Sequence, residues 1–124
     1  MLDDRSKARL QDVHPDLVRV VEMAAANCPV NFIVTEGLRT KERQEQLVKS
    51  GASKTMNSRH LTGHAVDLAP VIGGEVRWDW PPFYQIAASM KQAADGLGVS
   101  IVWGGDWVTF KDGPHFELNR KEYP

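Results

Sequence analysis

Two histidines and an aspartate, His60, His64 and Asp67, lie within eight residues of one another. Imidazole nitrogens and carboxylate oxygens are natural ligands of zinc, and a catalytic zinc site takes three protein ligands and keeps one position open for water. A further ligand must come from elsewhere in the chain, and His115, three residues after Asp112, offers one. The sequence therefore predicts a metal site built from two separated segments.

His60 and His64 also have the four-residue spacing of a zinc-binding helix in which a glutamate beside the first histidine acts as the base. A leucine occupies the place of that glutamate, and Gly63 disfavours a helix between the histidines. If residues 64–68 instead form a strand, Asp67 points to the opposite face from His64, because side chains alternate along a strand. His60 could then fold back at Gly63 to lie beside Asp67, and His64 would be structural or would support a ligand.

These residues carry a resemblance to a known family. The pattern Ser58-x-His60-x-x-Gly63-x-Ala65-x-Asp67, followed far downstream by Asp112-x-x-His115, resembles the zinc D-alanyl-D-alanine carboxypeptidase superfamily. That group includes the vancomycin-resistance dipeptidases and the L-alanyl-D-glutamate endopeptidases that bacteriophages use as endolysins. The resemblance spans nearly the whole chain and extends to residues 10–17, 36–40, 103–107 and 114–117.

The resemblance implies a role for five residues. His60, Asp67 and His115 would be the Zn²⁺ ligands, and Asp112 would be the general base. Arg39 would stabilise the scissile carbonyl or bind a substrate carboxylate. Aspartate rather than glutamate at position 112 favours the endolysin branch. Two alternatives stay open: Asp112 could have a pure turn role, since Asp-Gly is a common turn pair, and Arg39 could form a surface ion pair with Glu36 or Glu42.

The implied activity is zinc-dependent hydrolysis of the L-alanyl-D-glutamate bond in the stem peptides of peptidoglycan. Two alternatives remain on the same scaffold. One is a D-alanyl-D-alanine carboxypeptidase or dipeptidase, because the choice of bond depends on the shape of the cleft. The other is a zinc-containing module that binds the cell wall without turnover, which the presence of both Asp112 and Arg39 disfavours.

The elements that must position these residues follow from hydrophobic periodicity and from glycine and proline. We expect helices over residues 3–13, 15–27 and 41–50, and another that starts near Pro81 and ends at Gly96 or Gly98. Strands are expected over residues 30–34, 64–68, 99–103 and 115–118, with a loop at residues 73–74. This order predicts an α+β fold, with a mainly antiparallel sheet flanked by helices. It resembles the hedgehog-like fold of the carboxypeptidase superfamily.

Several aromatic side chains and one histidine need a separate interpretation. Trp103, Trp107 and Phe110 precede the last ligand at roughly two-residue offsets, which favours the core over a cleft wall. The tryptophans at 78 and 80 are expected to pack the entry to the helix that follows. His14, before Pro15, is expected to pack against or cap a helix.

The composition limits the class of protein. The 124 residues fit one compact domain over residues 1–124, with 42% hydrophobic and 25% charged residues. A net charge of −1 gives no global sign of nucleic-acid binding, and the single cysteine excludes an intramolecular disulfide. No apolar run is long enough to span a membrane, and residues 1–7 lack the apolar stretch of a secretory signal. Together with the resemblance to phage endolysins, these features imply a monomer that is made in the host cytoplasm and reaches the cell wall, in the periplasm, after release.

Overall fold

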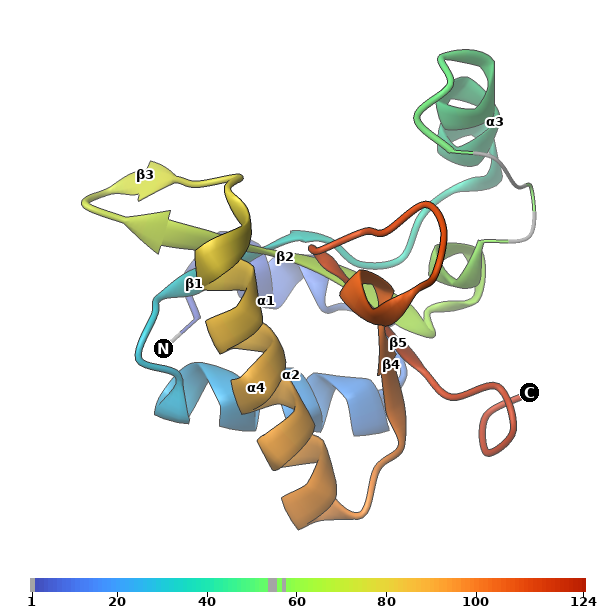
Figure 1. Ribbon diagram of the computed structural model, residues 1–124. Coiled ribbons are helices and arrows are strands. Elements are labelled where there is room, and N and C mark those ends of the chain that lie inside the picture. The colour runs from blue at the N-terminus through green and yellow to red at the C-terminus, as the bar shows by residue number, and fades with distance from the viewer. Residues whose placement is uncertain (1, 54–55, 57) are drawn as a thin grey trace.

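The computed structural model describes residues 2–53, 56 and 58–124. Its helices and strands are interspersed along the chain (Figure 1). The helices are α1 (Asp4–Arg9), α2 (Pro15–Asn27), α3 (Lys41–Lys49) and α4 (Trp80–Leu97), with 3₁₀ helices η1 (Arg59–Thr62) and η2 (Gly104–Asp106). The strands are β1 (Phe32–Glu36), β2 (Ala65–Ile72), β3 (Glu75–Val76), β4 (Ile101–Trp103) and β5 (His115–Leu118). The expected α+β class is confirmed.

The strands form an antiparallel sheet in the order β1-β2-β5-β4, and β3 pairs with β2. β2 lies between β1 and β5, and β4 is the edge strand beyond β5. In the β2–β5 pairing, Asp67 lies directly opposite His115. Directly opposite residues in an antiparallel pair have Cβ atoms about 5 Å apart. This register therefore brings together two side chains that are 48 positions apart in the sequence.

Helices α2 and α4 pack against each other and supply much of the core (Figure 1). In α2, Pro15 lies in the first turn and the side chain of His14 accepts a hydrogen bond from the backbone N–H of Asp16, which confirms the capping role of this histidine. The buried face of α2 consists of residues at helical spacing, Leu17, Val20, Val21 and Ala24. α3 lies apart from these two helices, at the upper right of Figure 1.

Several elements differ from the sequence-based expectation. β1 and β4 each begin two residues later than expected, and three further differences have a local cause. α1 ends at Arg9 rather than near Val13, since Asp12 has a φ of 66°, which no right-handed helix accommodates. β2 runs past Pro70 to Ile72, because Val71 and Ile72 pair with β3 and the carbonyl of Pro70 accepts a hydrogen bond from the N–H of Arg77. The expected loop at residues 73–74 is a tight turn with both glycines at positive φ, and it leads into β3, which the sequence pattern did not predict.

Within the described part of the chain, none of the helices has the length and apolar character needed to cross a lipid bilayer.

Candidate active site

His60 lies in η1, and two local features orient it. The side chain of Ser58 accepts a hydrogen bond from the backbone N–H of His60, and Gly63 ends the 3₁₀ helix with a φ of 74°. The chain therefore turns back at Gly63 and enters β2, as the sequence predicted. The ring is buried, with 2% of His60 exposed, and its Nδ1 lies 2.9 Å from the carbonyl oxygen of Gly37. Because a carbonyl only accepts, Nδ1 carries a proton, and Nε2 is the nitrogen left to face the cleft.

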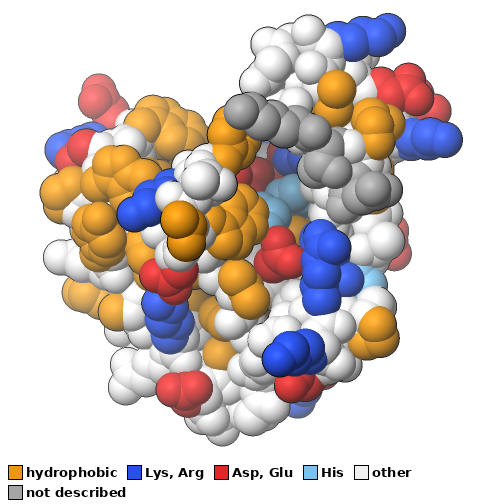
Figure 2. Space-filling model, turned by 45° about the vertical axis from the view of Figure 1, so that its right-hand side comes forward, with side chains coloured by type: hydrophobic (Ala, Val, Ile, Leu, Met, Phe, Trp, Pro, Cys, Tyr) orange, Lys and Arg blue, Asp and Glu red, His pale blue; other side chains and the backbone are white. Residues whose placement is uncertain are grey.

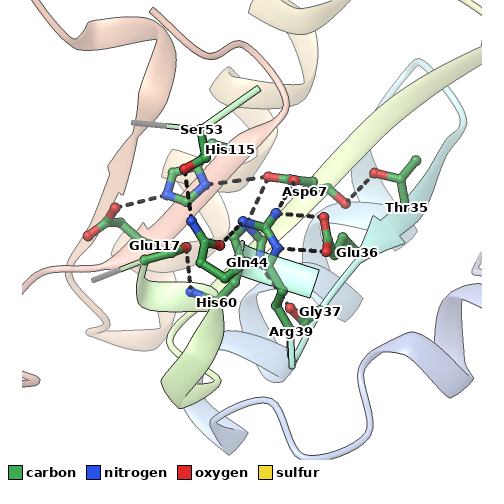
Figure 3. A network of polar contacts seen from close by, with 11 residues as sticks. Thr35, Glu36, Gly37, Arg39, Gln44, Ser53, His60, Asp67, His115 and Glu117 are labelled. Carbon is green, nitrogen blue, oxygen red and sulfur yellow. Dashed lines mark hydrogen bonds and ion pairs between the residues drawn. The ribbon is translucent and has the colours of Figure 1, made fainter. Parts of the chain in front are cut away.

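Nε2 of His60 faces Asp67. The distance from this nitrogen to Oδ1 of Asp67 is 3.2 Å, and the same oxygen lies 3.4 Å from Nδ1 of His115 (Figure 3). On the far side of the His115 ring, Nε2 lies 2.8 Å from Oε1 of Glu117. Each ring is therefore held by one nitrogen, and its other nitrogen faces the aspartate.

His60, Asp67 and His115 form a group that could hold a metal ion, with one ligand atom from each within 4.8 Å of the others. Tetrahedral zinc with bonds of about 2.0–2.1 Å places its ligand atoms about 3.3 Å apart. The separations of 3.2 and 3.4 Å around Asp67 match that value. The outer hydrogen bonds to Gly37 and Glu117 are of the kind that orients metal-bound histidines. The donor set and its spacing thus fit a zinc ion.

The electrostatics of the cluster reflect a buried carboxylate between two imidazoles. Burial would raise the pKa of Asp67, but hydrogen bonds with His115 and His60 hold that pKa well below its usual range. Burial would lower the pKa of His115, but Asp67 and Glu117 raise it to about 9. Without a metal ion, a proton on His115 therefore compensates the negative charge of Asp67, and a bound cation would take its place.

Asp112 lies in the turn before β5 and lines the same cleft as the three candidate ligands. Its backbone N–H donates to the carbonyl of Gly104, and its own carbonyl accepts from the N–H of His115. The indole of Trp103 donates to the carbonyl of Gly113, at 2.7 Å. Burial and the negative charge of Asp67 raise the pKa of the Asp112 carboxyl, although nearby cationic groups partly oppose this rise. Hydrogen bonds to η2 and to β5 therefore hold the turn that carries this carboxylate.

Arg39 also lines the cleft, with 8% of its side chain exposed. Its Nε and Nη2 donate to the two carboxylate oxygens of Glu36, at 2.7 and 2.6 Å, and its Nη1 donates to Gln44 (Figure 3). Nη2 also lies 3.7 Å from Oδ2 of Asp67. The ion pair with Glu36 anticipated from the sequence is present, but it is buried beside the ligand cluster rather than on the open surface.

The cleft has a volume of about 390 Å³. Trp107 and Phe110 line it, and the ring of Trp107 lies 5.1 Å from that of His115. The expectation that both belong to the core is wrong for these two residues, because the segment after η2 turns outward and Phe110 has a φ of 54°. The expectation is confirmed for Trp103, which is 4% exposed and stacks on Phe116.

His64 lies outside the ligand cluster. Its Nδ1 is 2.6 Å from the hydroxyl of Thr62, and its ring packs 5.7 Å from that of His14. The sequence-based choice of His60 rather than His64 as the partner of Asp67 agrees with this geometry.

Sequence reasoning assigned no role to Glu117 or to the carbonyl of Gly37. Glu117 follows His115 by two positions in a predicted strand, so alternation alone places both side chains on one face of the sheet. The two-residue spacing could therefore have identified Glu117 as a neighbour of His115. The contact of Gly37 with His60 depends on how the loop after β1 meets η1, which no local pattern shows.

Comparison with known proteins places the chain in a family. A family model described as phage L-alanyl-D-glutamate peptidase matches residues 1–122. The L-alanyl-D-glutamate peptidase of Escherichia phage T5 is 33% identical over 122 residues, which cover 95% of this chain and 88% of that protein. The crystal structure of the Serratia marcescens L-Ala D-Glu endopeptidase ChiX is 47% identical, with a TM-score of 0.95 over all of this chain and 94% of that one.

A more distant structure shares the fold alone. The vancomycin-resistance D,D-dipeptidase VanXYg, solved with a D-Ala-D-Ala phosphinate analogue, is 18% identical. It superposes with a TM-score of 0.56 over 86% of this chain and 50% of that chain. The family model and the two more similar relatives confirm the resemblance seen in the sequence motifs: the chain belongs to the phage L-alanyl-D-glutamate peptidase family.

Proposed function

We propose that the protein is a zinc peptidase that hydrolyses the L-alanyl-D-glutamate bond of peptidoglycan stem peptides. The observation that carries this proposal is the set of three ligand atoms at zinc-like spacing, beside a carboxylate of raised pKa in an open cleft. The names of its relatives support the choice of bond. His60, Asp67 and His115 would hold the ion. When bound, zinc would polarise the scissile carbonyl and lower the pKa of water toward neutrality.

Asp112 is the proposed general base. Its carboxylate would accept a proton from the attacking water and pass it to the amine that leaves as the peptide bond breaks. The raised pKa favours the first step, because it makes the carboxylate a stronger base toward the proton of the attacking water. The hydrogen bonds to η2 keep the turn that carries this carboxylate in place.

Arg39 is proposed to stabilise negative charge that develops on the scissile carbonyl. Glu36 and Gln44 hold the guanidinium in one orientation, so little reorganisation is needed during the reaction. Its positive charge on the cleft wall would act on the substrate across a short distance in a partly buried site.

The proposal extends to where the protein works. Hydrolysis of stem peptides would occur at the cell wall, and we expect a monomer that needs neither nucleic acid nor insertion into a membrane.

The test is mass spectrometry of purified Gram-negative peptidoglycan after incubation with the zinc-loaded protein, with and without a chelator. We expect products with newly freed glutamate amines, and we expect the chelator to abolish them. Release of D-alanine would instead assign the protein to the carboxypeptidase branch. A folded, zinc-loaded sample that produces no new ends would overturn the proposal.

A further inference from the structure

The proposed substrate has different chemical groups on the two sides of its scissile bond. The inference drawn from this difference rests on the function proposed above. In a stem peptide, the amino group of L-alanine is joined to the lactyl group of N-acetylmuramic acid. A neutral sugar therefore lies one residue from the scissile bond on one side. On the other side, D-glutamate carries a free α-carboxylate. A cleft that fits this substrate should be unlike at its two ends.

One end of the cleft adjoins an exposed group of aromatic side chains, Trp78, Trp80 and Tyr84, which we call the aromatic surface. These residues are 63%, 38% and 58% exposed, although aromatic side chains of this size are usually buried in large part. The rings of Trp80 and Tyr84 are 5.9 Å apart, and Trp78 stacks on Phe83, which is buried at the start of α4. The rings are therefore held by the helix beneath them.

The aromatic surface is continuous with the candidate active site. A second hollow, of about 220 Å³, is lined by Trp78 and Trp80 and by Lys111 and Asp112. Asp112 also lines the main cleft, so a substrate lying beside the proposed base would reach both hollows. The two charged residues of the second hollow are of opposite sign.

A cationic group lies in the main cleft away from the second hollow. Arg59 and Arg120 line the main cleft but not the second hollow, and Nε of each lies 3.8 Å from Oε2 of Glu117. The Arg59 side chain is 10% exposed. Its Nη2 donates to the backbone carbonyls of Leu118 and Tyr123. Its Nε is buried, and among the described residues it has no hydrogen-bond partner. A buried donor left unpaired is costly unless a ligand uses it.

Figure 2 shows this difference across the hollow that contains the histidines. Hydrophobic side chains gather on one side, and side chains of both charges lie on the other.

We propose that the stem peptide crosses the candidate metal site in one direction, with its sugar on the aromatic surface and its D-glutamate carboxylate toward Arg59 and Arg120. The apolar C–H face of a pyranose ring packs against an indole or a phenol in the way that ligands pack on aromatic pocket walls. A carboxylate suits a guanidinium in both charge and geometry. The aromatic surface is then a glycan subsite that joins the peptide cleft.

The sugar part of the proposal is tested with two soluble substrates, the free stem peptide and the same peptide attached to N-acetylmuramic acid. Trp78→Ala and Tyr84→Ala should each raise KM for the sugar-bearing substrate about tenfold more than KM for the free peptide, the scale of one lost aromatic contact. Met23→Ala removes an exposed apolar side chain from α2 and should change neither value. Equal effects on both substrates would overturn the sugar assignment.

The carboxylate part is tested with Arg120→Gln, since the Arg120 side chain is 65% exposed and its replacement should not affect folding. This variant should raise KM for the peptide with a free D-glutamate α-carboxylate about fivefold, an effect of the size expected for a partly exposed charge pair. With the α-amide form of the peptide, the variant and the parent should not differ. The direction of binding is wrong if the amide and the acid respond equally. The proposed function itself fails only if the parent cleaves neither substrate.

Discussion

Hydrogen bonds decide which nitrogen of each histidine faces the candidate metal. His60 uses Nδ1 for the carbonyl of Gly37, and His115 uses Nε2 for the carboxylate of Glu117. The two rings therefore present different nitrogens to Asp67. A negatively charged partner such as Glu117 also makes the imidazole a stronger ligand.

This arrangement makes Glu117 a test of the metal site that leaves all three ligands in place. Glu117→Gln keeps the size of the side chain but removes its charge, so zinc affinity should fall about tenfold. Competition with a chelator at fixed pH measures the change. Glu122→Gln, at an exposed position near the C-terminus, is the matched control and should bind zinc like the parent. Unchanged affinity in Glu117→Gln would show that the contact with His115 does not support metal binding.

Asp112 is the residue whose loss should separate catalysis from metal binding. Asp112→Asn is nearly isosteric but cannot accept the proton of the attacking water, so kcat should fall at least 100-fold. Zinc content and thermal stability should stay close to those of the parent. Asp106→Asn, which changes an exposed aspartate paired with Lys91, serves as the control. Turnover within a few-fold of the parent would remove Asp112 from the mechanism.

At the scale of elements, the site depends on three local turns around one strand pair. The antiparallel pairing of β2 with β5 places Asp67 opposite His115, η1 returns His60 to the same point, and η2 holds the turn that carries Asp112. Each of these turns contains a glycine or contacts one.

Gly104 shows how closely the turn and η2 approach each other. A Cβ at this position would collide with the carbonyl oxygen of Asp112 and would press on the Cβ atoms of Asp112 and His115. Gly104→Ala should therefore lower the free energy of unfolding by about 1–3 kcal/mol and also reduce kcat. Urea titration and a peptidase assay measure both effects.

Gly96 provides the comparison for that substitution. It lies exposed in α4. No neighbouring atom comes within 4 Å of the place where the methyl group of an alanine would lie. Alanine is also a better helix former than glycine. Gly96→Ala should leave activity unchanged and raise stability by about 0.5–1 kcal/mol. If the two variants behaved alike, the close approach at Gly104 would not explain the position of Asp112.

The sequence predicted most elements, because hydrophobic spacing and chain breakers are local signals. The expected bounds of β5 match those observed, and α4 begins and ends within a residue of the expectation. The errors lie where local signals mislead: Pro70 suggests a strand end that the structure does not have, and the two-residue turn conceals the short β3.

The sequence also predicted most of the residues that the structure brings together in the candidate site. The structure brings together the three candidate ligands, with Asp112 and Arg39 on the walls of the same cleft. The outward position of Trp107 and Phe110 could not be predicted, because periodicity does not distinguish a core face from a cleft wall. The full set of contacts made by Arg39 also depends on the packing of α3 against the loop after β1.

At the scale of the whole molecule, the ligand cluster links stability to pH when metal is absent. Attraction to Asp67 and Glu117 outweighs burial and raises the folded-state pKa of His115 from 6.5 to about 9. The resulting stabilisation is fully present below pH 6.5 and is lost as the pH rises through about 9. Asp67 has a lowered folded-state pKa, so its ionised carboxylate stabilises the fold at neutral pH. This stabilisation is lost only in acid.

We therefore expect the Tm of the chelator-treated protein to fall by about 5 °C between pH 7 and pH 9.5. Circular dichroism at each pH measures this decrease, and His115→Ala, which lacks the titrating ring, should show a flatter profile. A parent profile as flat as that of the variant would mean that His115 is not protonated in the metal-free fold.

The most direct test of the account is the position of zinc in crystals of the zinc-loaded protein, measured by anomalous diffraction on both sides of the zinc absorption edge. We predict one strong peak, about 2.0–2.2 Å from Nε2 of His60, Oδ1 of Asp67 and Nδ1 of His115. A peak bonded to His64 instead, or none at this cluster in crystals that contain zinc, would contradict the proposed metal centre.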